Sequence, residues 1–363
     1  MPLVLDPHRP LGKELLSEFA ASIDSFLTSQ RELVADVGAE PILTQARAFT
    51  AGGKRLRPAF ALWAYVAANG EVTPAVVQAA ASLDLLHVSA LIHDDIIDGS
   101  ATRRGLPAAH VYYASQHRAD GGLGDEASFG QAAAILLGDV LSMWSVEMFE
   151  QAELPQPGKQ LASSQLSRMR SEVMCGQYLD IAAAYGMAGA ASLTEAHEVA
   201  RRVLEYKSAR YSVARPVQIG ASLADASPAV IAGLAAFGSG VGRAFQLRDD
   251  LLGVFGDEAK TGKPAGDDIR EGKRTFLVLA ALAEATPAQH DRLNSYLGNA
   301  ELSKAELAQA RDIITETGAV ASVETMIETE TATAMAALAD LELSEPGRLA
   351  LTRLAELSTS RDH

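Results

Sequence analysis

Residues 83–98 read LDLLHVSALIHDDIID, and residues 99–105 continue with GSATRRG. Apolar residues recur in this stretch at positions i, i+3, i+4 and i+7, which is the pattern of a helix with a buried face. Asp94 and Asp98 are four residues apart, so their carboxylates lie on one face of this helix, close enough to share divalent cations. The stretch therefore predicts a core helix that carries a cluster of carboxylates.

The same helical period covers most of the 363 residues. Strand-like alternation is hard to find, and the breaks rich in Gly and Pro, such as residues 119–125 and 255–272, are too short to be long linkers. With 48% hydrophobic residues the chain can bury a large core. We predict an all-α protein with a single domain over residues 1–363, in which residues 276–363 carry no motif and form a helical scaffold. The expected helices span residues 11–37, 74–97, 129–151, 161–185, 193–223 and 228–252.

Charge and composition exclude several classes of function. The 46 acidic and 31 basic side chains give a net charge of −15, which repels phosphate backbones and argues against binding of nucleic acid or anionic membranes. Cys175 is the only cysteine, so no intrachain disulfide is possible, and we expect it to be a small buried side chain on a helix. The first residues lack the pattern of a secretory signal, and no uncharged stretch is long and apolar enough to span a bilayer, residues 226–242 coming nearest. We expect a cytoplasmic protein.

Two acidic clusters predict the chemistry. Asp94, Asp95 and Asp98 place three carboxylates within five residues, which costs desolvation and repulsion unless positive charge compensates. Alone, this motif would be typical of a solvated acidic turn, but Asp249 and Asp250 end a second apolar helix later in the chain. Oxygen-only ligands suit Mg²⁺, which bridges carboxylates to substrate phosphates. Two such clusters across a helical cavity predict a site that ionises a diphosphate ester. The loop after the second cluster adds Asp257, Asp267, Asp268, Lys260, Lys263, Lys273 and Arg274.

Basic clusters complement the carboxylates. The segment GGKRLRP, residues 52–58, places three cations after two glycines whose backbone N–H groups can bind an anion. Each basic side chain taken alone is typical of a solvated surface. Because they accompany the carboxylates in an acidic chain, these basic side chains together predict binding sites for two diphosphates. One diphosphate would be bound through metal ions and the other directly. These cations are Lys54, Arg55, Arg57, Arg103, Arg104 and Lys207.

The order and spacing of these motifs resemble the trans-isoprenyl diphosphate synthases, the all-α polyprenyl synthetase family. The resemblance runs over residues 52–275 and implies one isoprenoid-synthase helical bundle around a central cavity. It also implies a homodimer. The matching motifs are GGKRLRP, LDLLHVSALIHDDIID with RRGLPAAH, GDVL, GQYLD, YKSA, GRAFQLRDD and GKPAGDDIREGKRT.

The resemblance also implies a reaction and the residues that perform it. About three Mg²⁺ ions help an allylic diphosphate to ionise, isopentenyl diphosphate attacks head to tail, and the released diphosphate removes the proton, giving an all-trans prenyl diphosphate. The implied metal ligands are Asp94, Asp98 and Asp249, supported by Asp95 and Asp250. The residues implied for the allylic diphosphate are Arg103, Lys207, Lys263 and Lys273, and those for isopentenyl diphosphate are Lys54, Arg57, His87 and Arg104. Phe245 and Gln246 are implied beside the reacting carbons, and Gln177 and Asp180 along the cavity wall.

The sequence departs from the family pattern at Gly253, where relatives carry a third aspartate, and Asp257 lies one turn further on. The third metal site is the one this departure affects, and we expect activity to survive. Ser208 replaces a common threonine and keeps its hydroxyl.

Product length is readable from the helix below the first cluster. Ser89 and Ala90 lie one helical turn, about 5.4 Å, below the metal face, and both are small. The resemblance implies that bulky aromatic side chains there, as in family members that stop at farnesyl diphosphate, would close the pocket, so we expect a longer product, geranylgeranyl diphosphate. Four residues could form a floor further down, but are better explained as ordinary core: Leu86, Met143, Trp144 and Met148.

Other interpretations stay open at this point. The enzyme could stop at farnesyl diphosphate or make longer polyprenyl chains. A class I terpene cyclase shares the helical fold and an acidic first motif, but it would lack the GGKRLRP segment and the paired Arg103 and Arg104. A catalytically silent partner subunit would have broken metal motifs, whereas Asp94, Asp98 and Asp249 are all present.

Overall fold

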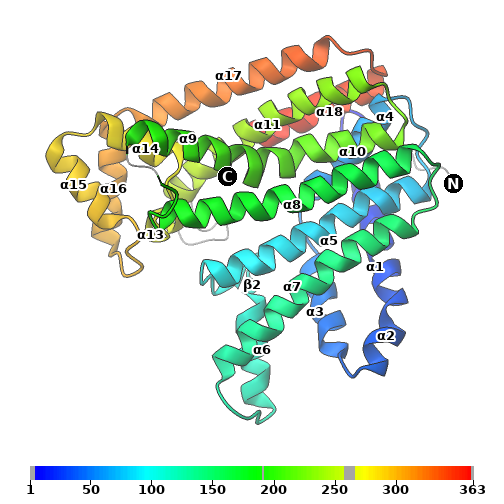
Figure 1. The fold of residues 1–363 in the computed structure, drawn as a ribbon, viewed down its shortest axis with the longest axis horizontal. Coiled ribbons are helices and arrows are strands. Elements are labelled where there is room, and N and C mark those ends of the chain that lie inside the picture. The colour runs from blue at the N-terminus through cyan, green and yellow to red at the C-terminus, as the bar shows by residue number, and fades with distance from the viewer. Residues whose placement is uncertain (1–4, 190–191, 257–265, 361–363) are drawn as a thin grey trace. The chain divides into compact units, whose positions relative to one another are not determined.

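The protein is almost entirely helical (Figure 1). A computed structural model describes residues 5–189, 192–256 and 266–360. Within these ranges the only strands are β1 (Thr102–Arg103) and β2 (Leu106–Pro107), which form one antiparallel pair. The all-α prediction is confirmed.

The chain divides into two compact units. The first comprises Met1–Ser163, Ile219–Ala226 and Leu343–Arg353, and the second comprises Ser164–Gln218, Ser227–Glu342 and Leu354–His363. The expected single domain over residues 1–363 stays a prediction. The first unit holds both strands and helices α1 (Lys13–Ser29), α2 (Arg31–Asp36), α3 (Glu40–Thr50), α4 (Leu56–Ala67), α5 (Pro74–Ile97), α6 (Ala109–Ala119) and α7 (Glu126–Gln151). The second unit holds α9 (Leu193–Val203), the π-helix η1 (Leu204–Ala214), α11 (Pro228–Phe255), α13 (Asp267–Arg270), α14 (Phe276–Glu284), α15 (Pro287–Tyr296), α16 (Lys304–Glu316) and α17 (Ala319–Ala339). Three helices contribute residues to both units: α8 (Gly158–Ala184), α10 (Arg215–Leu223) and α18 (Glu345–Thr359).

Helix α5 is the core helix of the first unit. It packs against α1, α4 and α7, and α7 runs alongside it in Figure 1. Leu83, Leu85 and Leu86 point in different directions around the helix axis, and all three are fully buried. The helix begins where the side chain of Thr73 accepts a hydrogen bond from the backbone of Val76. The apolar stretch in the sequence is therefore a helix enclosed on all sides, and its carboxylates lie at its far end.

Helix α11 is the core helix of the second unit. It packs against η1 and α17, and its residues Leu247, Leu251 and Val254 belong to one buried apolar cluster with residues of α13, α14, α16 and α17. Gly242 permits the close approach of η1, because a Cβ at this position would lie 2.6 Å from the Cα of Ala209. The glycines of α11 thus have a packing role.

Two expected helices differ from the structure. The segment expected as one helix over residues 11–37 is divided at Gln30, which ends α1 and begins α2. The segment over residues 193–223 is continuous, but its middle third, η1, is a π-helix between α9 and α10. Hydrophobic periodicity does not reveal a π-helix, because the π form depends on contacts with neighbouring helices.

Three helices are long and apolar enough, by length and composition, to cross a membrane: α5, α7 and α11. The expectation from the sequence concerned uncharged stretches only, and these windows also admit up to two charged residues. In α5, 72% of the most apolar window is buried inside the protein, and in α7 and α11 44% is buried. In α5, most of this apolar surface therefore forms protein core.

Candidate active site

The last turn of α5 holds the first carboxylate cluster. The helix ends at Ile97. Gly99, two residues later, has a φ of 65°, the left-handed conformation that glycine adopts easily, and the N–H of Ser100 donates to the carbonyl of Asp95 at 2.9 Å. Asp94, Asp95 and Asp98 thus lie at the carbonyl end of the helix, which carries partial negative charge. Carboxylates are unfavourable at this end of a helix, so the cluster requires positive charge nearby.

Arg103 supplies part of that charge. Its Nε lies 2.8 Å from Oδ1 and 3.1 Å from Oδ2 of Asp95, and its Nη2 forms an ion pair with Oδ1. Asp95 is 1% exposed. Burial opposes the charged form of Arg103, but the hydrogen bond and the charge of Asp95, with the charges of Asp94 and Asp98, raise its pKa overall. Asp95 therefore faces inward and holds an arginine, while Asp94 and Asp98 are half-buried.

A tight hairpin positions the two arginines of the RRG segment. Arg104 and Gly105 form the turn between β1 and β2, and both have positive φ, 53° and 77°, as this kind of two-residue turn requires. The guanidinium of Arg104 packs on the backbone of Gly53, where a Cβ would lie 2.9 Å from Nη1 of Arg104. The glycine-rich loop and the hairpin therefore meet.

Positive charge surrounds His87 on α5. Burial lowers the pKa of His87 well below its usual value, and the charges of Arg57, Arg104, Arg103 and Arg55 lower it further. The imidazole is therefore neutral at physiological pH and can take part in hydrogen bonds without adding charge.

Arg55 differs from the other cations of the GGKRLRP segment. It is 5% exposed, forms an ion pair with buried Asp84 and donates to the carbonyl of Thr50. Burial, with the charge of Arg104, lowers the pKa of Arg55 to about 10. Its role is thus internal, whereas Lys54 is exposed.

The second carboxylate cluster lies on α11. Asp250 is buried and accepts a hydrogen bond from Nε2 of Gln246 at 2.8 Å, and Asp249 is half-buried. Burial raises the pKa of Asp250 to about 8; the charges of Asp268, Asp249 and Asp180 act in the same direction, and the hydrogen bond from Gln246 opposes them. Negative charge is therefore in excess here, and a bound cation would relieve it. Phe245 is half-buried beside Gln246.

Asp268 occupies the space that Gly253 leaves. A Cβ at Gly253 would lie 2.0 Å from Oδ2 of Asp268. Asp268 comes from α13, which is joined to α11 by a hydrogen bond from the N–H of Gly266 to the carbonyl of Gly253 at 3.1 Å. Lys273 lies 3.4 Å from Oδ1 of the same carboxylate. A carboxylate thus stands where the family pattern has a third aspartate, but it comes from another helix.

Lys207 lies on η1 and contacts α8. Its Nζ lies 2.5 Å from Oδ2 of Asp180. Gln177 is half-buried one turn before Asp180. In each unit, therefore, a predicted diphosphate-binding cation is held by a carboxylate: Arg103 by Asp95 and Lys207 by Asp180.

The donor sets of both clusters fit Mg²⁺. No group of three or more His, Cys, Asp or Glu side chains in the described ranges is arranged to hold a metal by itself. Each cluster instead offers carboxylate oxygens only, the first at a helix end and the second among other negative charges. This suits an ion that keeps several waters and completes its shell with substrate phosphates.

The structure also changes several expectations. Met143 is 65% exposed, so it is neither core nor a floor, whereas Leu86, Trp144 and Met148 are buried. Cys175 is exposed, because α8 turns the adjacent Gly176 and not the cysteine toward η1. Ser89 is fully buried and Ala90 half-buried. The expected roles of Asp257, Lys260 and Lys263 lie outside the described residues.

Sequence reasoning missed three features of the site. It gave no role to His93, which contacts α7 where Gly138 lacks a side chain and lies 3.4 Å from Asp139. It placed Asp268 in the loop but did not connect it to Gly253. It also missed Glu172, which binds two arginines beside Lys207. The glycine of GDVL was the available signal for the first feature.

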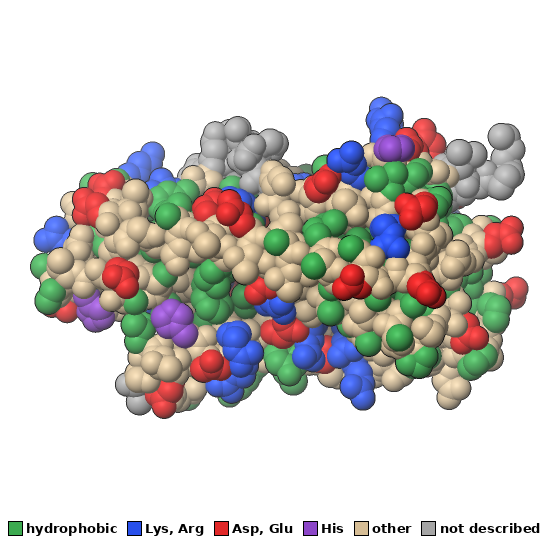
Figure 2. Space-filling model, turned by 90° about the horizontal axis from the view of Figure 1, so that it is seen from above, with side chains coloured by type: hydrophobic (Ala, Val, Ile, Leu, Met, Phe, Trp, Pro, Cys, Tyr) green, Lys and Arg blue, Asp and Glu red, His purple; other side chains and the backbone are tan. Residues whose placement is uncertain are grey.

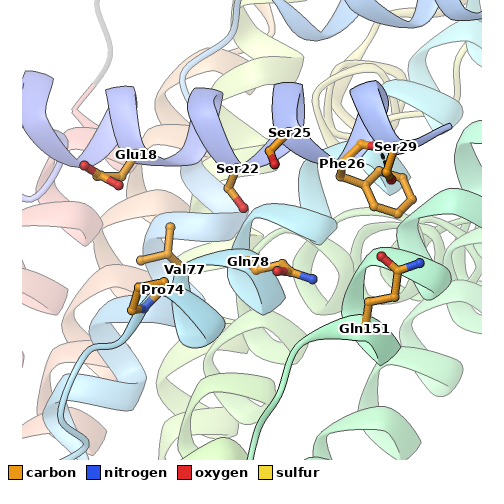
Figure 3. Close-up of a pocket in the computed structure, with 9 residues that line it drawn as sticks. All are labelled: Glu18, Ser22, Ser25, Phe26, Ser29, Pro74, Val77, Gln78 and Gln151. Carbon is orange, nitrogen blue, oxygen red and sulfur yellow. Dashed lines mark hydrogen bonds between the residues drawn. The ribbon is translucent and has the colours of Figure 1, made fainter. Parts of the chain in front are cut away.

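Outside the motifs, the described residues form a surface of mixed charge (Figure 2) and a pocket in the first unit. Acidic and basic side chains are interspersed over the face shown in Figure 2. A pocket of about 360 Å³ in the first unit lies between α1, the start of α5 and the end of α7 (Figure 3). It is lined by Glu18, Ser22, Ser25, Phe26, Ser29, Pro74, Val77, Gln78 and Gln151, none of which belongs to a motif.

Several known proteins are similar to this chain over most of its length. The family model described as "Polyprenyl synthetase" matches residues 40–314. A "Short chain isoprenyl diphosphate synthase" from Methanothermobacter thermautotrophicus is 33% identical over 92% of this chain and 94% of its own length. A "Geranylgeranyl diphosphate synthase" from Saccharolobus solfataricus is 34% identical over 73% of this chain and 74% of its own. The crystal structure of geranylgeranyl pyrophosphate synthase from Corynebacterium glutamicum, complexed with isoprenyl diphosphate and magnesium, has a TM-score of 0.90 and 38% identity, covering 96% of this chain and 99% of that one.

The chain belongs to the polyprenyl synthetase family. It is a prenyltransferase with the all-α fold of its structural relatives.

Proposed function

We propose that the protein condenses isopentenyl diphosphate head to tail with allylic diphosphates, with geranylgeranyl diphosphate as its main product. The observation that carries the proposal is an arrangement that occurs twice. In each instance an apolar helix carries a carboxylate cluster, and a cation nearby forms an ion pair with a carboxylate. The pairs Asp95–Arg103 and Asp180–Lys207 are its two instances. Carboxylates that bind Mg²⁺ and cations that bind phosphate are the two requirements for ionising a diphosphate ester.

The carboxylates hold the metal in this proposal. Asp94, Asp98 and Asp249 bind about three Mg²⁺ ions, with Asp95 and Asp250 in support. Bound Mg²⁺ neutralises the charge that develops on the departing diphosphate. Asp268 supplies the carboxylate that Gly253 lacks, which the 2.0 Å separation between its Oδ2 and a Cβ at position 253 supports. Excess negative charge around Asp250 supports a cation at this place.

The cations and the neutral histidine hold the substrates. Arginine forms paired hydrogen bonds to phosphate, and lysine acts as a point charge. The neutral ring of His87 adds a hydrogen bond without repelling the surrounding arginines. Phe245 and Gln246 lie beside the reacting carbons. The allylic diphosphate is bound by Arg103, Lys207, Lys263 and Lys273, and isopentenyl diphosphate by Lys54, Arg57, His87 and Arg104.

The small side chains below the first cluster support a twenty-carbon product. Ser89 and Ala90 lie one turn from Asp94 and leave room where an aromatic ring would close the cavity. Ser89→Phe should move the main product from twenty to fifteen carbons. Because Ser89 is fully buried, Ala90→Phe at the half-buried neighbour provides the same test if the first variant does not fold.

The test of the function is a product analysis. Purified protein is incubated with Mg²⁺, radiolabelled isopentenyl diphosphate and each of the dimethylallyl, geranyl and farnesyl diphosphates, and chain lengths are resolved after dephosphorylation. We expect twenty-carbon product from all three primers. A fifteen-carbon limit would retain the reaction and refute the product length. Cyclic hydrocarbons in place of prenyl diphosphates would favour a terpene cyclase. Substrate binding without elongation would favour a catalytically silent subunit.

We also propose that two copies associate through α7 and that the dimer is cytoplasmic. Phe129, Leu136 and Met143 are spaced by seven residues along α7 and are 47%, 57% and 65% exposed. Apolar residues seven positions apart form a stripe along one face of a helix, and such a stripe can pack against a second helix. Leu136→Glu should convert a dimer to a monomer in sedimentation analysis, while Leu123→Glu, at an exposed loop position, should leave the dimer intact. A wild-type monomer at micromolar concentration would refute the dimer.

A further inference from the structure

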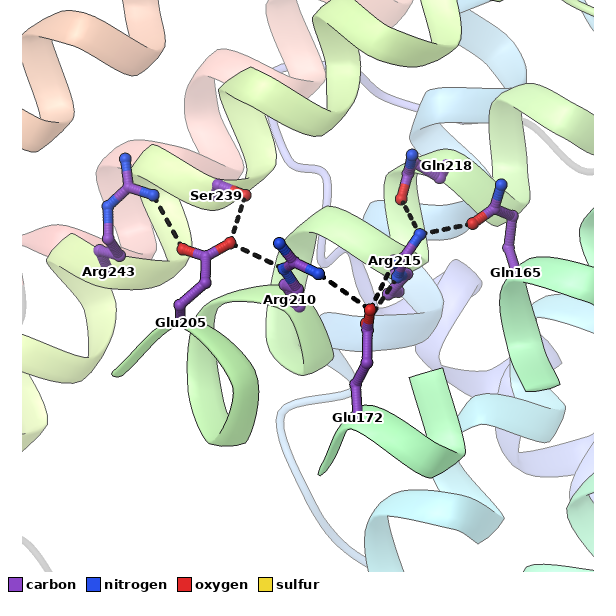
Figure 4. A network of polar contacts seen from close by, with 8 residues as sticks. All are labelled: Gln165, Glu172, Glu205, Arg210, Arg215, Gln218, Ser239 and Arg243. Atoms are coloured by element: carbon purple, nitrogen blue, oxygen red, sulfur yellow. Dashed lines mark hydrogen bonds and ion pairs between the residues drawn. The ribbon is translucent and has the colours of Figure 1, made fainter. Parts of the chain in front are cut away.

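The helix that carries Lys207 is unusual. Helix η1 is a π-helix over eleven residues, Leu204–Ala214, whereas most π-helices are single-turn insertions. Such a long run needs stabilising contacts from outside the backbone. Those contacts lie in a network of ion pairs within the second unit (Figure 4).

The network uses the spacing of the π-helix. Arg210 binds Glu205, five residues before it, with Nε 2.9 Å from Oε1. Arg215, five residues further on, binds Glu172 of α8, and so does Arg210. A π-helix joins backbone groups five residues apart by hydrogen bonds, so such residues lie on roughly the same side of the helix. In an α-helix the same residues would point about 140° apart. These side chains can share one side of the helix only while η1 keeps its π form.

One face of α8 contacts η1 and the residues next to it at three positions. Glu172, Gly176 and Asp180 are four residues apart, so they line one side of α8. Glu172 binds the two arginines, and Asp180 binds the ammonium of Lys207. Between them the backbones touch, because a Cβ at Gly176 would lie 2.4 Å from the backbone nitrogen of Lys207. The depth at which Lys207 sits against α8 is therefore set by contacts on both sides of Gly176.

The same network continues from Glu205 to α11 and α17. Arg243 of α11 binds Glu205 at 2.9 Å and Glu330 of α17 at 2.7 Å. The hydrogen bonds of Glu205 and Glu172 to arginines lower the pKa of both carboxyls although burial acts against this. Glu172 and Glu205 are thus held in their charged form, and the network contains as many acids as bases. The acids are Glu172, Glu205 and Glu330, and the bases Arg210, Arg215 and Arg243.

We propose that Glu172 is a positioning residue for the reaction: through Arg210 and Arg215 it keeps η1 in its π form and so fixes Lys207 where its ammonium meets the allylic diphosphate. The inference rests on the proposed function of Lys207. Glu172 itself does not touch the substrate in this account. Its loss should therefore weaken binding of the allylic diphosphate specifically, and only as long as Lys207 is present.

The test compares Glu172→Gln with Glu198→Gln, which removes the same charge from an exposed ion pair with Arg201 on α9. Glu172→Gln should raise KM for the allylic diphosphate about tenfold, as expected when one positioned charged contact is lost, and change KM for isopentenyl diphosphate less than about twofold. Glu198→Gln should change neither. In a Lys207→Ala background, Glu172→Gln should add less than about twofold, because both changes remove the same interaction. An equal rise in both KM values, or a full tenfold effect without Lys207, would overturn the proposal.

Hydrogen exchange separates this proposal from the proposed function. Backbone amides of residues 204–214 should exchange faster in Glu172→Gln than in the wild type or in Glu198→Gln. Unchanged exchange would refute the positioning role even in an active enzyme, and an inactive wild type with faster exchange in the variant would refute only the substrate assignment. Arg210→Lys keeps the charge but loses the paired geometry, and it should show the same exchange and KM pattern if Glu172→Gln does not fold.

Discussion

Replacing Gly253 with alanine tests whether Asp268 serves as the third carboxylate of the second cluster. The added Cβ would lie 2.0 Å from Oδ2 and 2.6 Å from Cγ of Asp268, so this side chain must rotate away from α11. Alanine within a helix gains about 1 kcal/mol over glycine. The rotation loses the contact with Lys273, a partly buried pair at 3.4 Å, and costs about 1 kcal/mol in all. These effects offset each other, so the free energy of unfolding should change by less than about 1 kcal/mol.

Metal binding should respond more strongly than stability. Loss of a carboxylate that supports bound metal reduces affinity about tenfold or more. Calorimetric titration with Mg²⁺ in the presence of pyrophosphate, paired with urea unfolding, measures both quantities. The double variant with Gly253→Asp and Asp268→Ala should recover most of the lost affinity, because it moves the carboxylate back to α11. Unchanged Mg²⁺ affinity in Gly253→Ala would refute the role of Asp268.

Three further predictions concern stability. Gly138→Ala places a Cβ 2.3 Å from Nε2 of His93 and should cost about 1–3 kcal/mol in urea unfolding; a neutral result would mean that the ring moves freely. Asp95→Ala leaves the charge of Arg103 buried without its partner and should cost about 3 kcal/mol without any metal, by the same assay, and a loss below about 1 kcal/mol would contradict the pairing. Because the pKa of Asp250 is raised to about 8, the folded protein without divalent cations binds more protons than the unfolded chain from about pH 4 to 8, so the free energy of unfolding should fall as the pH rises through this range. Asp250→Asn should remove this fall, and a stability that increases with pH in the wild type but not in the variant would contradict it.

The sequence was sufficient for the fold class and for most of the long helices. Helical periodicity predicted the long helices, and the helix over residues 74–97 agrees with α5 at both ends. The motif RRG predicted basic side chains after the first acidic cluster, and the structure places Arg103 on Asp95. These successes depend on local patterns, which the chain carries within a few turns of helix.

The remainder depends on contacts between segments far apart in the chain. The π form of η1 is maintained by Glu172 and Arg243, which lie on other helices, so no local pattern reveals it. The carboxylate at Gly253 comes from Asp268 across a loop, and its position depends on how α13 docks on α11. Methionine is usually buried, yet Met143 is exposed. The contacts of α7 with α5 and α6 determine which side of α7 faces the core.

The most direct test of the central claim is incorporation of radiolabelled isopentenyl diphosphate with farnesyl diphosphate as the only allylic primer, with Mg²⁺ or with a chelator. We predict a single labelled product that becomes a twenty-carbon prenyl alcohol after dephosphorylation, and none with the chelator. Absence of labelled product in the presence of Mg²⁺ from folded protein would contradict the proposed condensation to geranylgeranyl diphosphate.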